Sequence, residues 1–360
     1  MYTFNDKGGR SITLKPEGTA GVVRSFVESG LCAGPQPNKM YYLSTPIFRY
    51  ENPQAGRLRE HHQFGVEVFG APDPSADAEI IALALKLFGK LGIENLKLNI
   101  NSIGCEKCRP EYKKALISYL NDHKSELCGN CLERMERNPL RVLDCKVDGC
   151  KKVAEGAPRI VDFLCDECQV HFSGLKRYLS ALGIEYEVNP LIVRGLDYYT
   201  KTVFEIISDN IGAQGTVCGG GRYDKLVKEI GGPDMAGVGF GLGIERLLLV
   251  MENCGIEIPE PVMCDIYIAP LGDEAALWAF KAVNALRDAG VKAETDHVGR
   301  SMKAQMKFAD KLGARYMCAV GDTELGSGRA SLRCMQDGSE TEADITDING
   351  LIEFFKKGNR

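Results

Sequence analysis

Residues 193–205, VRGLDYYTKTVFE, place an arginine, an aspartate and two tyrosines within six positions of an otherwise apolar and β-branched segment. Buried hydrogen-bonding groups destabilise a fold unless each finds a partner, so an ordinary core strand does not need so many of them. The segment therefore indicates a pocket for a small polar ligand. Its polar residues are the candidates to line such a pocket, although for Asp197 and Tyr198 bracing of the loop is the better explanation.

A second polar segment, residues 48–70, has the pattern strand, polar turn, strand. Because side chains alternate along a strand, Arg49 and Glu51 share a face, and Arg57 lies in the turn. Guanidinium groups match phosphate in shape and charge, so these arginines could hold a polyphosphate or an RNA backbone. For any single arginine, a surface ion pair stays an open alternative. The second strand offers three residues on one face: Gln63, Gly65 and Glu67.

Two glycine-rich segments predict close approach to the backbone. Residues 237–243 have glycine at alternate positions, which leaves one face of a strand open to a flat group, and Arg246 follows in the first turn of a helix. Tight packing would explain the glycines but not the arginine. The pattern lacks the strand-to-helix turn and downstream acid of a dinucleotide-binding fingerprint. Residues 219–221 form the second segment and predict the floor of a cavity.

Eight of the 14 cysteines lie between residues 105 and 168. They form four closely spaced pairs: Cys105 and Cys108, Cys128 and Cys131, Cys145 and Cys150, and Cys165 and Cys168. Such spacings let one loop offer two thiolates to a tetrahedral metal, so Zn²⁺ is one interpretation and reduced structural thiols are the other. Both interpretations give the cysteines a structural role. A metal ion bound by four thiolates has no open coordination position for chemistry.

The composition of the chain limits the classes of protein to which it can belong. The 360 residues, 44% of them hydrophobic, suffice for two or three globular domains. A net charge of −5 does not indicate a nucleic-acid partner, so RNA binding would need a local basic face. No apolar run reaches the roughly 18 residues of a membrane span, and the first residues do not resemble an export signal. We expect a cytoplasmic protein with no membrane partner.

Helix and strand patterns divide the chain into four segments. Residues 1–104 begin with a predicted hairpin and include a helix after Asp77 that stops at Gly92. Residues 105–186 hold the cysteines and two predicted helices, and they interrupt two β-rich parts. The second β-rich part is 187–256, and after a proline-marked linker residues 264–360 alternate strands and helices as in an α/β domain.

Together these motifs resemble the bacterial histidyl-tRNA synthetases, which are class II aminoacyl-tRNA synthetases. FRYE with its arginine-containing turn resembles class II motif 2, and GVGFGLGIERLLL resembles motif 3. VRGLDYYTKTVFE and GGGRYD resemble the two peptides peculiar to the histidine enzymes. The resemblance implies an α+β fold: an antiparallel sheet flanked by helices, a helical insertion, and a C-terminal α/β anticodon-binding domain.

The resemblance also implies roles for individual residues. The catalytic arginines would be Arg194 and Arg49, both on the α-phosphate of ATP, with Arg194 also touching the substrate carboxylate. The implied ATP-binding set is Arg49, Glu51, Arg57 and Arg246. The implied L-histidine-binding set is Glu17, Thr19, Gln63, Glu67, Tyr198, Tyr199 and Arg194, in which Glu67 and Tyr199 bond the two imidazole nitrogens. A carboxylate and a phenol suit that role, since an amino acid without these nitrogens would leave both unpaired.

The implied reaction is a two-step ligation. Histidine and ATP, with Mg²⁺ on the β- and γ-phosphates, give histidyl-adenylate and pyrophosphate, and the acyl group then passes to tRNA(His). Arg300, Lys303, Lys307 and Lys311 are spaced to share one helix face that could contact the anticodon arm. A solvated helix surface explains the same spacing.

One family element has no match in this sequence. Motif 1, a long helix and strand at the dimer interface of class II enzymes, would precede the segment that begins at Met1. We therefore expect a homodimer when motif 1 is present and poor activity from this chain alone. The alternatives are a histidine-binding regulatory paralogue of ATP phosphoribosyltransferase, an inactive truncated synthetase, a noncatalytic RNA-sensing module and a metal-dependent nucleic-acid binder. The first is disfavoured because such relatives generally lack the terminal domain.

Overall fold

The structure, a computed structural model, describes residues 1–50, 53, 58–194, 196–209, 215–259 and 261–357. It consists of two compact units, Met1–Glu257 and Ile258–Arg360. Among the described residues, no helix combines the length and the apolar character that crossing a membrane requires.

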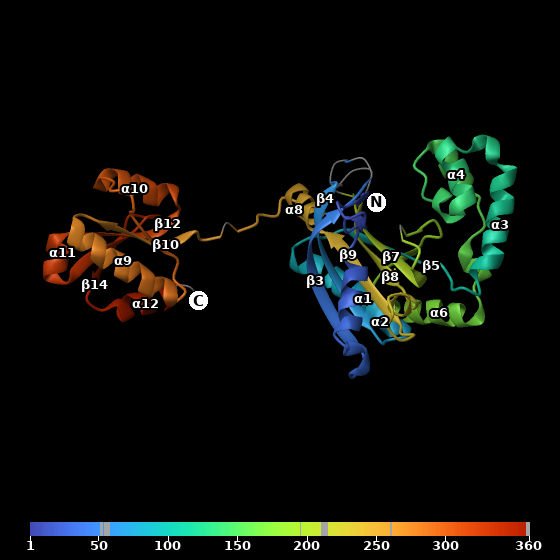
Figure 1. The fold of residues 1–360 in the computed structure, drawn as a ribbon, viewed down its shortest axis with the longest axis horizontal. Helices are drawn as coiled ribbons and strands as arrows, with labels where there is room; N and C mark the ends of the chain where they lie inside the picture. Colours follow the sequence, from blue (N-terminus) through green and yellow to red (C-terminus); the bar gives the residue numbers. More distant parts are fainter. Residues whose placement is uncertain (51–52, 54–57, 195, 210–214, 260, 358–360) are drawn as a thin grey trace. The chain divides into compact units, whose positions relative to one another are not determined.

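The first unit is built on a seven-stranded sheet with the order β3-β4-β9-β8-β7-β5-β6 (Figure 1). In that order the strands are Asn38–Phe48, Glu60–Phe69, Gly237–Gly243, Thr216–Arg222, Thr200–Ser208, Leu96–Ser102 and Glu187–Val188. Neighbouring strands are antiparallel except β5 and β6, which are parallel. The antiparallel sheet flanked by helices confirms the predicted α+β class. The predicted N-terminal hairpin is also present, as β1 (Thr3–Asn5) and β2 (Ser11–Thr13).

Helices α1, α2, α7 and α8 of the first unit span Thr19–Glu28, Pro74–Lys90, Leu226–Glu229 and Ile244–Asn253, and a short 3-10 helix covers Leu31–Ala33. The prediction that α2 follows Asp77 was wrong by one turn. Asp73 caps the helix by accepting a 2.8 Å hydrogen bond from the Ser75 amide, and Pro74 occupies the first position, where its missing N–H costs nothing. Asp77 is therefore inside the helix, where it is fully buried.

The insertion between β5 and β6 has its own small core. Its α-helices are α3 (Arg109–Asp122), α4 (Gly129–Arg137), α5 (Asp148–Glu155) and α6 (Asp166–Ala181), with 3-10 turns at Lys124–Glu126, Pro139–Val142 and Ile160–Phe163. The sequence predicted α3 and α6 but not α4 and α5, which are 9 and 8 residues long and too short for a clear periodic signal. Helix α6 packs instead against α2, where Phe172, Leu175 and Leu179 join the main core.

The second unit alternates strands and helices as predicted. Its sheet has the order β11-β10-β12-β13-β14, with strands Ala293–Thr295, Cys264–Pro270, Ala314–Val320, Arg329–Cys334 and Glu340–Asp344. The first three are parallel and the last two add an antiparallel hairpin. The helices are α9 (Asp273–Asp288), α10 (Met302–Lys311), α11 (Asp322–Ser327) and α12 (Ile348–Lys357).

The largest buried polar group in the first unit is the side chain of Arg222, at the end of β8. Its N–H groups donate to both carboxylate oxygens of Asp77, to Asp224 and to the carbonyls of Ala71 and Asp73. A guanidinium has five N–H donors, and these five contacts match them. Burial by itself would raise the pKa of Asp77, but the charge of Arg222 and the hydrogen bonds of His171 and Arg222 outweigh it and lower the pKa below its usual value.

We predict that Asp77→Asn destabilises the first unit by about 3–5 kcal/mol, because it removes the fully buried carboxylate that faces the Arg222 guanidinium and leaves only the partly exposed Asp224 as a counter-charge. Urea unfolding followed by far-ultraviolet circular dichroism measures the change. The single tryptophan, Trp278, lies in α9 of the second unit, so its fluorescence transition should stay unchanged. Asp209→Asn is the matched control: its 2.7 Å ion pair with Lys97 is 66% exposed on both sides and is worth at most about 1 kcal/mol. Equal effects of the two variants would contradict the prediction.

Candidate functional site

The candidate site is centred on Glu67, a buried carboxyl group in the middle of the sheet. Glu67 lies on β4 with 1% of its surface exposed, and it pairs across the sheet with Gly239 on β9. A β-carbon at Gly239 would lie 1.8 Å from Glu67 Oε2, so only glycine leaves space for the carboxyl group there. Oε2 accepts a hydrogen bond from the Tyr223 hydroxyl. Oε1 is buried and has no hydrogen-bond partner among the described residues.

Burial raises the pKa of Glu67 to about 8, and the hydrogen bond from Tyr223 offsets only part of this shift. Below that pH the free protein therefore keeps the Glu67 carboxyl group protonated. A protonated carboxyl can donate one hydrogen bond and accept others, which suits a ligand carrying both a ring donor and a ring acceptor.

Three tyrosine rings lie next to Glu67. Ring centroids are 4.8 Å apart for Tyr198 and Tyr199, 5.8 Å for Tyr198 and Tyr223, and 6.5 Å for Tyr199 and Tyr223. The Arg194 guanidinium carbon lies 5.5 Å from the centre of the Tyr199 ring. Tyr223 thus links Glu67 to Tyr199, and Tyr199 links to Arg194, so the structure brings Glu67, Tyr199 and Arg194 into one contiguous cluster.

Strands β7 and β8 position the side chain of Arg194. Its Nη1 donates to Glu205 Oε1 at 3.0 Å, and its Nε is buried without a hydrogen-bond partner among the described residues. A β-carbon at Gly219 would lie 2.4 Å from Nη1, which explains why the glycine-rich β8 runs beneath this arginine. The predicted cavity floor is therefore the surface on which the guanidinium lies.

A second group of predicted residues gathers at the N-terminus of α1. Glu17 accepts hydrogen bonds from the amides of Thr19 at 2.6 Å and Ala20 at 2.8 Å, and the Tyr198 hydroxyl donates to Glu17 at 3.4 Å. Gln63 Oε1 accepts from the Gly18 amide at 3.0 Å. Glu17, Thr19 and Gln63 therefore lie together beside the tyrosine cluster, where two acceptors can meet an ammonium group.

The two described arginines of the predicted ATP set lie around His61, at the start of β4. Burial and the positive charges of Arg49 and Arg246 lower the pKa of His61 to about 4, against the opposing effect of Glu245. Both guanidinium groups therefore act electrostatically on the same imidazole. Arg246 also donates to the Thr216 carbonyl at 2.5 Å, which connects α8 to β8. Glu51 and Arg57 lie outside the described residues, so their predicted roles stay predictions.

Sequence reasoning missed Tyr223 and Tyr42 as site residues. Tyr223 was available in GGGRYD, but only the fold shows that its hydroxyl reaches Glu67. Tyr42 pairs with Gly65 across β3 and β4, and a β-carbon there would lie 2.2 Å from the tyrosine ring. The glycine on β4 was the signal, since it marks a place where a large side chain crosses the strand. Asp197 is exposed and accepts a 3.0 Å hydrogen bond from Asn138 of the insertion, consistent with bracing the loop.

The clustered cysteines form two separate groups of four, each of which could hold a metal ion. The groups are Cys105, Cys108, Cys165 and Cys168, and Cys128, Cys131, Cys145 and Cys150. Both belong to the insertion and its junction with the sheet.

Comparison with protein-family models identifies the family of the chain. The model described as histidyl-tRNA synthetase matches residues 1–247, and the one described as anticodon binding domain matches residues 265–357. The chain belongs to the histidyl-tRNA synthetase family.

Similar proteins support the assignment along nearly the whole chain. The histidine–tRNA ligase of Caldanaerobacter subterraneus subsp. tengcongensis is 60% identical over 353 residues, covering 98% of this chain and 84% of that protein. The histidine–tRNA ligase of Clostridium botulinum is 55% identical, covering 99% of this chain and 85% of the relative. The structure of apo S. aureus histidyl-tRNA synthetase aligns with a TM-score of 0.80 at 43% identity, over 99% of this chain and 86% of that one.

Proposed function

We propose that the cluster of Glu67, Tyr199 and Arg194 binds histidine beside ATP, and that the chain activates histidine as histidyl-adenylate for transfer to tRNA(His). The chain is a histidine–tRNA ligase by family, an ATP-dependent aminoacyl-tRNA synthetase. The observation that carries the residue assignment is that two segments distant in the sequence, β4 with Glu67 and residues 194–199, meet in one cluster, in which Glu67 Oε1 and Arg194 Nε have no protein partner among the described residues. The match to an anticodon-binding domain disfavours the regulatory-paralogue alternative.

Histidine recognition is assigned to the buried carboxyl and phenol groups. Glu67 bonds one imidazole nitrogen and Tyr199 the other, with Tyr223 holding the carboxyl of Glu67 in place. Glu17, Thr19 and Gln63 surround the α-amino group, and Tyr198 closes the pocket through its hydroxyl contact with Glu17. An amino acid without two ring nitrogens would leave buried polar groups unpaired, which is the strongest available source of selectivity.

Arg194 and Arg49 stabilise the charge that develops during activation. An oxygen of the histidine carboxylate attacks the α-phosphorus of ATP, the bond to the β-phosphate breaks, and pyrophosphate leaves. Arg194 contacts both the carboxylate and the α-phosphate, Arg49 contacts the α-phosphate, and Arg246 packs against the adenine. Glu51 and Arg57 complete the ATP-binding set. The reaction needs no protein nucleophile, because positioning and charge stabilisation supply the rate enhancement.

Mg²⁺ fits this scheme because the β- and γ-phosphate oxygens are the hard ligands it prefers, and it neutralises part of their charge. In the second step a hydroxyl of the terminal tRNA ribose attacks the acyl carbon, and AMP leaves. The proposed location is the cytoplasm, where the tRNA is charged.

A homodimer is the proposed assembly when motif 1 is present. Strand β3 lies at an edge of the described sheet, and its Tyr41 and Leu43 side chains are 75% and 67% exposed. Apolar side chains on a sheet edge favour burial against a partner. Light scattering coupled to size-exclusion chromatography tests this part: a monomer at micromolar concentration would contradict it.

We predict that histidine affinity falls as the pH rises above 8. The bound complex holds one proton between Glu67 and the imidazole. Free histidine has an imidazole pKa of about 6.5, and between this value and the Glu67 pKa of about 8 the carboxyl already carries that proton. Above the Glu67 pKa, binding must take up a proton, so Kd rises by about tenfold per pH unit. Calorimetric titration of histidine without ATP measures it.

Glu67→Gln is the control for this pH dependence. The amide keeps the shape but does not titrate, so binding should be weaker and lose the Glu67 component of the pH profile. The α-amino group of histidine contributes equally to both proteins, so the difference between their profiles isolates Glu67. Parallel profiles would contradict the assignment.

We predict that Arg194→Lys lowers kcat for histidine-dependent ATP–pyrophosphate exchange by about 10²–10³. Lysine keeps the charge but loses the fork that bonds carboxylate and phosphate at once. Arg24→Lys is the matched control, since Arg24 is 68% exposed and its ion pair with Glu28 spans 3.7 Å. Exchange at the wild-type rate in Arg194→Lys would rule out the proposed role.

The predicted basic face of α10 is smaller than the sequence indicated. Arg300 precedes the helix, which begins at Met302 after its cap Ser301. Arg300 pairs with Asp296 at 2.6 Å and lies 4.3 Å from the centre of the Phe308 ring. Its guanidinium is therefore occupied within its own unit. The exposed basic residues of the face are Lys303, Lys307 and Lys311.

We predict that replacing these three lysines together with alanine raises KM for tRNA(His) and leaves pyrophosphate exchange unchanged. The slope of log affinity against log salt should fall by about one for each lysine that contacts a phosphate. Lys281→Ala, an exposed lysine on α9, is the control. An unchanged KM and salt slope would show that the face is only solvated.

A further inference from the structure

We infer that the insertion holds two structural Zn²⁺ ions, each bound by four cysteine thiolates. Site 1 is defined as Cys105, Cys108, Cys165 and Cys168, and site 2 as Cys128, Cys131, Cys145 and Cys150. This assignment resolves the pairing that sequence spacing left open. The first and last cysteine pairs share one ion, and the two middle pairs share the other.

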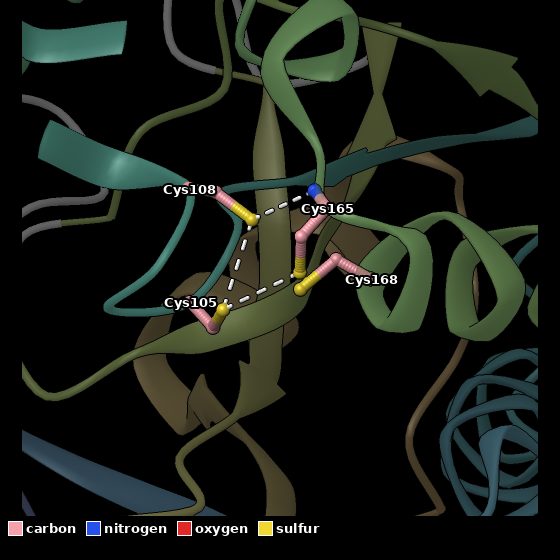
Figure 2. A group of neighbouring side chains, drawn as sticks. All are labelled: Cys105, Cys108, Cys165 and Cys168. Carbon is pink, nitrogen blue, oxygen red and sulfur yellow. Dashed lines mark hydrogen bonds between the residues drawn. The ribbon is translucent and has the colours of Figure 1, made fainter. Parts of the chain in front are cut away.

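The sulfur positions match tetrahedral zinc. All ligand sulfurs within each group lie within 4.8 Å of one another. In site 1 the sulfur of Cys105 is 3.7 Å from that of Cys108 and 3.8 Å from that of Cys165, and Figure 2 shows the four side chains pointing toward a common centre. In site 2 the sulfur of Cys128 is 3.9 Å from that of Cys145. Zinc–sulfur bonds of about 2.3 Å in a tetrahedron place the sulfurs about 3.8 Å apart. A disulfide would require about 2.05 Å.

Backbone amides also point at the sulfurs. The Cys165 amide donates to Cys108 Sγ at 3.1 Å, and the Cys128 amide donates to Cys150 Sγ at 3.2 Å. Such outer contacts orient metal ligands and stabilise thiolate charge. Gly104 makes the turn of site 1, with a φ of +64°. A β-carbon there would lie 2.7 Å from the β-carbon of Cys108.

Packing of reduced thiols explains these features less well. Apolar packing has no preference for four sulfurs around one point, and it does not need amide donors directed at them. The insertion's own apolar core is small, and its helices α4 and α5 have 9 and 8 residues, below the length at which a helix is stable alone. Helix α4 begins directly after Cys128, and α5 carries Cys150 in its first turn. Structural zinc supplies folding free energy to small modules of this kind.

Site 1 joins the start of the insertion to the start of its last helix, α6, which packs on the main core. Cys105 and Cys108 follow β5, and Cys165 and Cys168 begin α6. Next to them, Arg109 donates to the carbonyls of Ile103, at 3.2 Å, and Tyr199. Between the last two ligands, Glu167 bonds Lys201 at 2.8 Å, and the Lys201 amide donates to the Gly104 carbonyl at 2.8 Å. Site 1 therefore fixes residues 199–201 from two sides. Site 2 has no comparable contact with them among the described residues.

The decisive experiment is metal analysis of the full chain, purified without chelator and without added metal. Two zinc ions per chain are expected. Iron in place of zinc, or less than one metal ion per chain, would overturn the proposal. Cobalt exchanged into the protein should give the intense visible absorption of tetrahedral thiolate coordination at two equivalents, and saturation at any other value would count against two sites.

Paired variants test which cysteines share an ion. Cys105→Ser with Cys165→Ser, and Cys128→Ser with Cys145→Ser, should each leave one zinc ion per chain. Cys334→Ser, on β13 of the second unit, is the matched control and should retain two. Loss of both ions from the soluble, folded form of either double variant would refute two independent sites. If a double variant does not fold, the wild-type zinc and cobalt stoichiometries still decide the proposal.

The link between site 1 and Tyr199 rests on the proposed function. Loss of site 1 should raise KM for histidine in pyrophosphate exchange several-fold, whereas loss of site 2 should leave it near the wild-type value. Equal effects would refute the link while leaving the metal count intact. Absence of histidine-dependent exchange in the wild-type protein would instead count against the proposed function, since the zinc stoichiometry does not depend on it.

Discussion

The fully buried Arg222 guanidinium is the interaction on which the rest of the first unit depends. A buried charge is tolerated only when its donors are matched, and Arg222 reaches Asp77 on α2 as well as the carbonyls that follow β4. These contacts fix the end of β8 against α2. The next residue is Tyr223, whose hydroxyl bonds Glu67, and the one after is Asp224, which lies 3.5 Å from Lys201. The hydrogen bonds that pair the buried Arg222 guanidinium therefore also fix the position of the site.

A second constraint is space within the sheet. Strands β8 and β9 lie beside β7 and β4, and their glycines leave room for Arg194 and Glu67 where ordinary side chains would fill the face. Buried polar groups such as these lower the free energy of unfolding unless each has a hydrogen-bond partner. The same cost makes a ligand with matching donors and acceptors bind selectively. The same buried polar residues therefore determine the stability of the empty site and its selectivity for a ligand. The hydrogen bonds of Arg222 offset part of the free energy that the unpaired polar groups cost.

Much of this arrangement could be predicted from the sequence, and the exceptions share a cause. Alternation along β4 and the glycines of β9 identified the face that carries Gln63 and Glu67, because period-two patterns are local. The contact of Tyr223 with Glu67 joins residues 156 positions apart, so no local pattern contains it. The start of α2 was misplaced because Asp77 has the residue type of a cap but is held by Arg222. The helices α4 and α5 are short, and their packing around cysteines rather than their periodicity defines them.

The cysteine pairing shows why a local signal can be strong and still incomplete. Each short spacing predicts half of a tetrahedral site, but four halves can combine in three ways. Only the fold selects the outcome, since β5 and the start of α6 lie together at the junction while the other two pairs lie within the insertion's own core. The second unit holds no comparable cysteine group among its described residues, and it packs α9 and α12 on a five-stranded sheet instead. The insertion buries its apolar residues in a small core of short helices without a sheet layer, and bonds from thiolates to a metal ion would add to the stability of such a core.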